Sequence, residues 1–124
     1  MEDIRQFGKR GEELAARHLK GLGYRILERN FRTPSGEVDI VAMDGGVLVF
    51  VEVKSRRDMS FGAPELAVNR RKIMQVQKAA LTYLARTKKG NTPCRFDVVA
   101  VSMLPGEDTK VDVIKDAFEM SGGY

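Results

Sequence analysis

The sequence predicts an α/β protein with a mixed central sheet flanked by helices, in the order α-β-β-β-α-β-β. Two long stretches have apolar residues at helical spacing, and runs rich in valine and isoleucine lie between and after them. Two of these runs are separated by Asp44-Gly45-Gly46, which is typical of a hairpin turn. A chain of 124 residues fits one domain, which we expect to cover residues 1–124.

The first element is expected to be a helix over residues 3–22, because its apolar residues recur near every 3.6 positions. Gly8 and Gly11 are unfavourable inside a helix. Either the helix proper begins near Gly11, or close backbone packing requires the glycines. A first strand is predicted over residues 24–29, followed by a loop over residues 30–36.

The central element is a predicted hairpin with strands over residues 38–43 and 47–54. A loop of Gly45-Gly46 would place Asp39 directly opposite Glu52. A loop one residue earlier would place the two acids diagonal to each other. Both registers bring two carboxylates together in strands that otherwise look built for burial.

Side chains alternate along a strand, so Asp39, Glu52 and Lys54 are expected on one face of the hairpin. Carboxylates this close repel by roughly 4 kcal/mol at an effective dielectric constant near 20. A fold tolerates this by protonating one acid, by pairing both with cations, or by binding a divalent metal. From spacing alone, a Mg²⁺ site and a buried Asp-Lys-Glu network that only holds the hairpin are equally good interpretations. The other face is expected to be apolar: Val38, Ile40, Ala42, Val49, Val51 and Val53.

After the hairpin we expect a loop over residues 59–63 and a helix over residues 64–86, with proline in its first turn. This helix contains the basic run 69–72, for which a solvated helix face is the simplest interpretation. The remaining predicted elements are strands over residues 95–103 and 111–114, the second at a sheet edge, and a short turn over residues 116–124.

The net charge of +4 is unevenly distributed along the chain. Residues 107–124 carry five acids and two bases, so residues 1–106 carry 19 bases against 12 acids. A basic body suits a polyanionic partner, although many soluble proteins are mildly basic.

Several classes of protein are excluded by what the sequence lacks. No apolar run approaches the ~20 residues that span a bilayer, and the first residues have no secretory apolar core, so we expect a cytoplasmic protein. Cys94 is the single cysteine and is expected in the core at the start of a strand. With the single His18, it cannot build a zinc site or a nucleophilic triad. No glycine-rich phosphate loop follows a strand, which argues against a nucleotide-binding fold.

The hairpin segments 37–42 (EVDIVA) and 50–55 (FVEVKS) resemble the D…E-x-K core of restriction-endonuclease-like nucleases. Nearly the whole chain resembles the YraN family, small bacterial proteins related to archaeal Holliday-junction resolvases. Val38 departs from the proline of many relatives, at a position outside the acidic set. The resemblance rests on Gly11-Glu12, Gly23-Tyr24, Asn30-Phe31, residues 36–39, residues 50–56, Phe61-Gly62, Lys72 and residues 95–98.

This resemblance implies a restriction-endonuclease-like domain that hydrolyses phosphodiester bonds in DNA, including branched, Holliday-junction-like DNA. The expected cofactor is Mg²⁺, for which Mn²⁺ would substitute. In that superfamily Asp39 and Glu52 would hold the metal, together with the backbone carbonyl of Val53. Because resolvases work as symmetric dimers, the resemblance also implies a homodimer.

Two further roles follow from the same resemblance. Lys54 would orient or help deprotonate the attacking water, and burial against Phe50 would lower its pKa toward the working range. Glu12 matches the first-helix acid of the resolvases, either as an additional metal ligand or as a support for one. The candidate phosphate contacts are Arg32, Arg56, Arg57, Arg70, Arg71 and Lys72.

Two other functions stay open. The main alternative is a non-catalytic module that keeps the nuclease fold and binds nucleic acid without cutting it. A purely structural or protein-binding role is the third, and it predicts no nucleic-acid binding even at low salt.

Overall fold

The structure is a computed structural model that describes residues 2–58 and 69–118. Its element order confirms the predicted α-β-β-β-α-β-β arrangement. The predicted loop 59–63, the first residues of the helix predicted from residue 64 and the end of the last turn lie outside the described residues. The elements are α1 (Ile4–Gly21), β1 (Arg25–Thr33), β2 (Gly36–Asp44), β3 (Val47–Arg56), α2 (Arg70–Thr87), β4 (Cys94–Ser102) and β5 (Lys110–Ile114).

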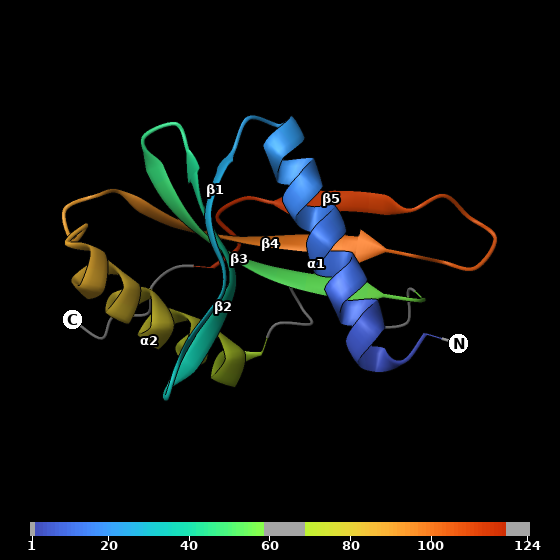
Figure 1. Cartoon of the computed structure of the whole chain (residues 1–124), viewed down its shortest axis with the longest axis horizontal. Coiled ribbons are helices and arrows are strands. Elements are labelled where there is room, and N and C mark those ends of the chain that lie inside the picture. The colour runs from blue at the N-terminus through green and yellow to red at the C-terminus, as the bar shows by residue number, and fades with distance from the viewer. Residues whose placement is uncertain (1, 59–68, 119–124) are drawn as a thin grey trace.

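The strands form one mixed sheet in the order β1-β2-β3-β4-β5 (Figure 1). Only β3 and β4 are parallel, and the chain between them carries α2, as a parallel pair requires a crossover. The other three pairs are antiparallel. The α/β class and the edge position of β5 are therefore confirmed.

The two helices pack on opposite faces of the sheet. Leu19 of α1 packs in a cluster with Ile40 and Val51, whereas Val76 of α2 packs in a second cluster with Phe50. Phe50 and Val51 are consecutive in β3, so their side chains point to opposite faces. The sheet is thus buried on both sides. Within the described residues, neither helix is long and apolar enough to cross a membrane.

Two glycines allow the helices to approach the strands closely. A Cβ added to Gly11 would lie 2.9 Å from Cβ of Ser55 on β3, whereas one added to Gly8 meets nothing within 4 Å. Close packing therefore explains Gly11, and the helix begins earlier, at Ile4. A Cβ on Gly36 would lie 2.7 Å from the carbonyl carbon of Gln75, so α2 contacts the β1–β2 turn directly.

The first strand is longer than predicted. Its pairing with β2 continues to Thr33, and only Pro34 and Ser35 lie between the two strands. The predicted loop over residues 30–36 is therefore wrong. The polar Asn30 suggested a loop, but it is a single residue with a φ of 54° inside the strand. Pairing resumes directly after it, at Phe31.

The predicted apolar face of the hairpin is also wrong at one position. Val38 packs in the α2 cluster with Phe31, whereas Ile40 packs in the α1 cluster. Residues two apart in a regular strand share a face, so the alternation breaks at Asp39. The break lies across from Asn30, which has a left-handed backbone conformation.

A buried polar network lies elsewhere in the sheet. Asp97 on β4 is fully buried and accepts hydrogen bonds from Nε of Arg95 at 2.8 Å, the hydroxyl of Tyr24 at 3.1 Å and the N–H of Asp116 at 3.0 Å. These bonds tie β4 to the start of β1 and to the segment after β5.

Cys94, one residue before Arg95, is exposed at the start of the strand, so its predicted place in the core is wrong.

Candidate metal and phosphate site

The hairpin register brings the two central acids together. Cross-strand pairs run from Asp44 with Val47 to Ile40 with Val51, so Gly45-Gly46 is the loop. This confirms the first of the two predicted registers. The next positions across the strands are Asp39 and Glu52, where the pairing stops.

The Asp39 carboxylate lies between the separating strands. Its Oδ2 accepts the N–H of Val53 on β3 at 2.8 Å, so the side chain takes the position of a sheet partner. Asp39 is 9% exposed and Glu52 is 7% exposed. In this nearly closed space each carboxyl group affects the pKa of the other.

Burial dominates the electrostatics of this pair. It raises the pKa of Glu52 to about 9, helped by the nearby charge of Asp39 and opposed by Lys72. Burial also raises the pKa of Asp39, although the N–H of Val53 stabilises its charged form. Burial and the charge of Asp39 therefore favour the protonated form of Glu52 more strongly than that of Asp39.

The cation beside this pair comes from α2. Nζ of Lys72 lies 3.6 Å from Oε1 of Glu52 and 3.6 Å from Oε1 of Glu37. Burial alone would lower the pKa of Lys72, but the carboxylates of Glu52, Asp39 and Glu37 raise it. The side chain of Asn69 caps α2 by accepting the N–H of Lys72 at 2.9 Å. The helix cap therefore fixes the position of this lysine.

Lys54 lies differently from its prediction. It is exposed near the end of β3 and makes no ion pair with any residue that the structure describes. The expected burial against Phe50 is therefore wrong, and Lys72 provides the pairing expected from Lys54. Alternation still places Lys54 on the same face of β3 as Glu52.

Glu12 of α1 lies near Asp39, one member of the pair. Burial and the charge of Asp39 raise its pKa, and a side-chain hydrogen bond with Asn30 opposes the rise. The neighbouring Glu13 instead pairs with Arg29 at 2.8 Å on the surface. Asn30 was not predicted as a site residue. Its presence in the Asn30-Phe31 segment of the family resemblance was the only signal in the sequence.

The set provides the kind of donors that a hard metal ion requires. Oε2 of Glu52 is buried with no hydrogen-bond partner among the described residues, and each carboxylate of the pair offers hard oxygen donors. No group of three or more His, Cys, Asp and Glu side chains suited to metal binding occurs in residues 2–58 and 69–118. This set fits Mg²⁺, which takes one or two carboxylates and keeps several waters, better than zinc.

Two of the predicted phosphate contacts lie at the end of β3. Nε of Arg56 donates to the hydroxyl of Ser102 at 3.0 Å, which holds it against β4. The guanidinium of Arg57 lies over the ring of Phe7, 4.2 Å from its centre.

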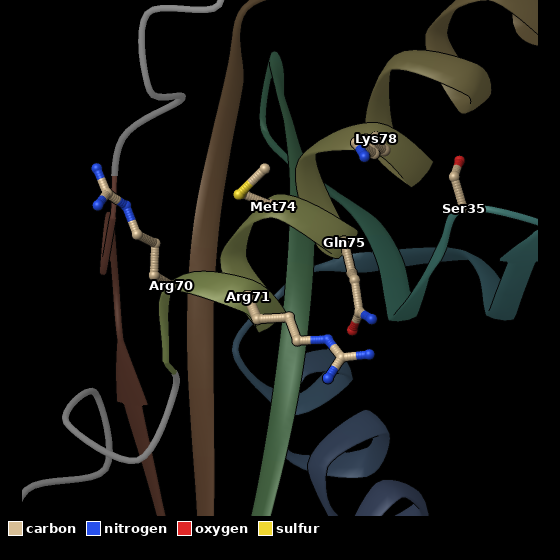
Figure 2. A pocket seen from close by; sticks show the side chains of 6 residues that line it. All are labelled: Ser35, Arg70, Arg71, Met74, Gln75 and Lys78. Carbon is tan, nitrogen blue, oxygen red and sulfur yellow. The ribbon is translucent and has the colours of Figure 1, made fainter.

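The other predicted contacts lie around α2 and the β1–β2 turn. Arg32 is exposed and lies 3.3 Å from Glu37 through its Nε. Arg70 and Arg71 are exposed in the first turn of α2 and line a groove there (Figure 2). The predicted solvated helix face thus describes these two arginines, whereas Lys72 of the same run points to the carboxylates.

The comparisons with known proteins all match one family over most of the chain. The model of the uncharacterised protein family UPF0102 matches residues 11–101. A UPF0102 protein of Syntrophus aciditrophicus is 51% identical over 116 residues, which cover 94% of this chain and 91% of the relative. One of Geobacter sulfurreducens is 50% identical over 114 residues, covering 92% and 89%. One of Geotalea daltonii is 48% identical over 119 residues, covering 96% and 94%. The chain therefore belongs to the UPF0102 family, the YraN family that its sequence resembles.

Proposed function

We propose that this protein is a Mg²⁺-dependent endonuclease that hydrolyses phosphodiester bonds in DNA, including branched DNA. The observation that carries the proposal is the pair Asp39 and Glu52, held opposite each other where β2 and β3 separate. Glu52 keeps a buried oxygen that no described residue pairs with, and its pKa is strongly raised. A site that stores such electrostatic strain is a typical feature of catalytic centres.

Asp39 and Glu52 would hold the metal, with the backbone carbonyl of Val53 as a third oxygen donor. Bound there, Mg²⁺ supplies positive charge to the scissile phosphate and lowers the pKa of a coordinated water. Glu52 has to give up its proton for this binding. The N–H of Val53 keeps Asp39 in place while this happens, because their hydrogen bond does not involve Glu52.

The lysines and Glu12 act around this pair. Lys54 is exposed, so its ammonium group is free to orient the attacking water and to offset charge on the transition state. Lys72 holds Glu52 from the other side through its 3.6 Å contact. Glu12 faces Asp39 with a raised pKa, which suits a group that accepts a proton from water near neutral pH.

Cleavage assays with matched variants test this proposal. Labelled four-way junction, flap, duplex and single-stranded DNA are incubated with Mg²⁺ or Mn²⁺ and wild-type protein, Asp39→Asn or Glu52→Gln. Glu13→Gln is the control, since it removes an exposed acid one residue from Glu12. We expect cutting by the wild type and the control alone. Cutting that survives both central substitutions would overturn the proposal.

One observation favours the alternative, a module that binds nucleic acid without cutting. Lys72 already compensates part of the carboxylate charge in the absence of any metal. A structural Asp-Lys-Glu network of that kind needs no Mg²⁺. Binding to these DNAs without cutting in either metal would favour the module. Cutting of two strands of a junction would in turn call for a homodimer, which sedimentation with and without DNA measures.

A further inference from the structure

A basic groove lies beside the carboxylate site, and we name it the α2 groove. Its volume is about 490 Å³, and one wall is a face of α2 on which residues recur at positions i, i+3, i+4 and i+7. The β1–β2 turn forms the other wall. In Figure 2, Arg71 and Gln75 point to the same side of α2, and Ser35 stands across from them on the turn. The lining residues are Ser35, Arg70, Arg71, Met74, Gln75 and Lys78.

The cations of the α2 groove are not neutralised by any residue in the described part of the chain. Arg70, Arg71 and Lys78 are exposed and form no ion pair with a described residue. Two of them occupy the first turn of α2, which contains no acid. Positive charge at a helix N-terminus is unfavourable because it opposes the helix dipole. An anionic ligand bound beside these cations would offset this cost. A helix face that only contacts solvent would have no reason to carry the cations at this position.

The α2 groove continues toward the carboxylate pair. A second hollow of about 290 Å³ shares Ser35 and Gln75 with it and is also lined by Glu37. Lys72 connects Glu37 to Glu52, with 3.6 Å to each carboxylate. The second hollow, whose charged lining residues are Arg32 and Glu37, therefore extends the α2 groove toward the side of the sheet where Lys72 contacts the pair.

We infer that the α2 groove binds the sugar-phosphate backbone of a nucleic-acid strand, two to three nucleotides from the phosphate at the carboxylate pair. The inference rests on the proposed function for the position of that phosphate. Lys78 lies six positions after Lys72 in α2, which corresponds to about 9 Å along the helix axis. A DNA strand rises about 3.4 Å per nucleotide, so about 9 Å corresponds to two to three nucleotides. Met74, 46% exposed among the cations, offers an apolar contact to a sugar.

The contacts in this groove carry charge but little base information. Arginine and lysine bound to phosphates set affinity and register rather than sequence preference. The groove therefore assigns the protein a strand-tracking surface that starts at the carboxylates and crosses the β1–β2 turn.

The test is the salt dependence of DNA binding, measured by fluorescence anisotropy in EDTA, where no cutting occurs. The probe is labelled flap DNA, and the groove variant carries Arg71→Gln and Lys78→Gln. The control variant carries Lys20→Gln and Arg25→Gln, two exposed cations far from the turn that remove the same charge. We expect the slope of log affinity against log salt to fall by about 1.8 in the groove variant and the control to keep the wild-type slope. An unchanged slope in the groove variant, or an equal loss in the control, would overturn the inference.

A second measurement locates the contact. A neutral methylphosphonate placed two or three nucleotides from the cut should weaken wild-type binding at least about threefold and leave the groove variant unaffected. An equal effect on both proteins would contradict the inference. If binding depends on the groove but no DNA is cut in Mg²⁺ or Mn²⁺, the proposed function is refuted and the inference about the α2 groove stands. If the wild type cuts DNA but the groove variant binds as the wild type does, the inference about the α2 groove is refuted and the proposed function stands.

Discussion

Lys72 of α2, rather than Lys54 of β3, is the lysine that reaches Glu52, with 3.6 Å between Nζ and Oε1. The charge balance of the hairpin therefore depends on where α2 begins. Asn69 sets that beginning by capping the helix at the N–H of Lys72.

The first prediction compares the two lysines. Lys72→Gln should lower the free energy of unfolding by about 1 kcal/mol at pH 7, because a half-buried ammonium group leaves the carboxylates. Lys54→Gln should change it by less than about 0.5 kcal/mol, as is usual for an exposed residue. Urea denaturation in EDTA measures both. Equal losses of unfolding free energy in the two variants would mean that the contact between Lys72 and Glu52 adds no stability beyond that of an exposed lysine.

The second prediction concerns Glu52 and pH. Its folded-state pKa of about 9 lies above the ordinary value of 4.5. The folded protein thus binds more protons than the unfolded chain between these values, and the associated stability is lost as pH rises through this range. Glu52→Gln removes this loss. We expect it to raise the free energy of unfolding by about 1 kcal/mol or more at pH 8 without metal, or roughly 4 °C in Tm.

Glu13→Gln is the matched control for this change. Its pKa is lowered by Arg29, so its charged form stabilises the folded protein and its removal should lower Tm slightly. A Glu52→Gln protein less stable than the wild type at pH 8 would favour a structural carboxylate network instead.

The third prediction tests the packing of α1 on β3. Gly11→Ala should destabilise the protein by about 1–3 kcal/mol, because the new Cβ would lie 2.9 Å from Cβ of Ser55. Gly8→Ala meets nothing within 4 Å and should stabilise by up to about 1 kcal/mol through helix propensity. Thermal melting of the two variants should shift Tm in opposite directions. Shifts of the same sign would contradict the close packing.

The fourth prediction concerns the buried network on β4. Arg95→Gln leaves the fully buried Asp97 without its cation, which should cost about 3–5 kcal/mol. Tyr24→Phe removes one hydrogen bond to Asp97 and should cost about 1 kcal/mol. Chemical denaturation separates these values. Similar losses would mean that the guanidinium is not the main partner of Asp97.

The fold was largely predictable because its signals are local. Gly45-Gly46 determines the hairpin register, and the valine-rich runs give the strands. The exceptions are local as well. Nothing in the residue pattern distinguishes Asn30 as one left-handed residue inside a strand from the start of a loop. The face change between Val38 and Ile40 lies directly across from this residue.

The environment of the acids was less predictable because it depends on tertiary packing. Lys72 belongs to a basic run that also fits a solvated helix face. A signal was present, since Lys72 continues the stripe of buried residues at Val76, Ala79 and Tyr83. The hydrogen bond between Glu12 and Asn30 joins a helix to a strand, and no spacing rule predicts it.

Whether the carboxylate pair is the catalytic centre is measured by the rate of flap cleavage with Mg²⁺ under single-turnover conditions, for the wild type and Glu52→Gln. We expect the variant to fold at least as stably as the wild type. Its cleavage rate should nevertheless be about 10³-fold lower, since metal binding contributes several kcal/mol to such reactions. A stable Glu52→Gln protein that cuts at the wild-type rate would contradict the assignment of the carboxylate pair as the catalytic centre.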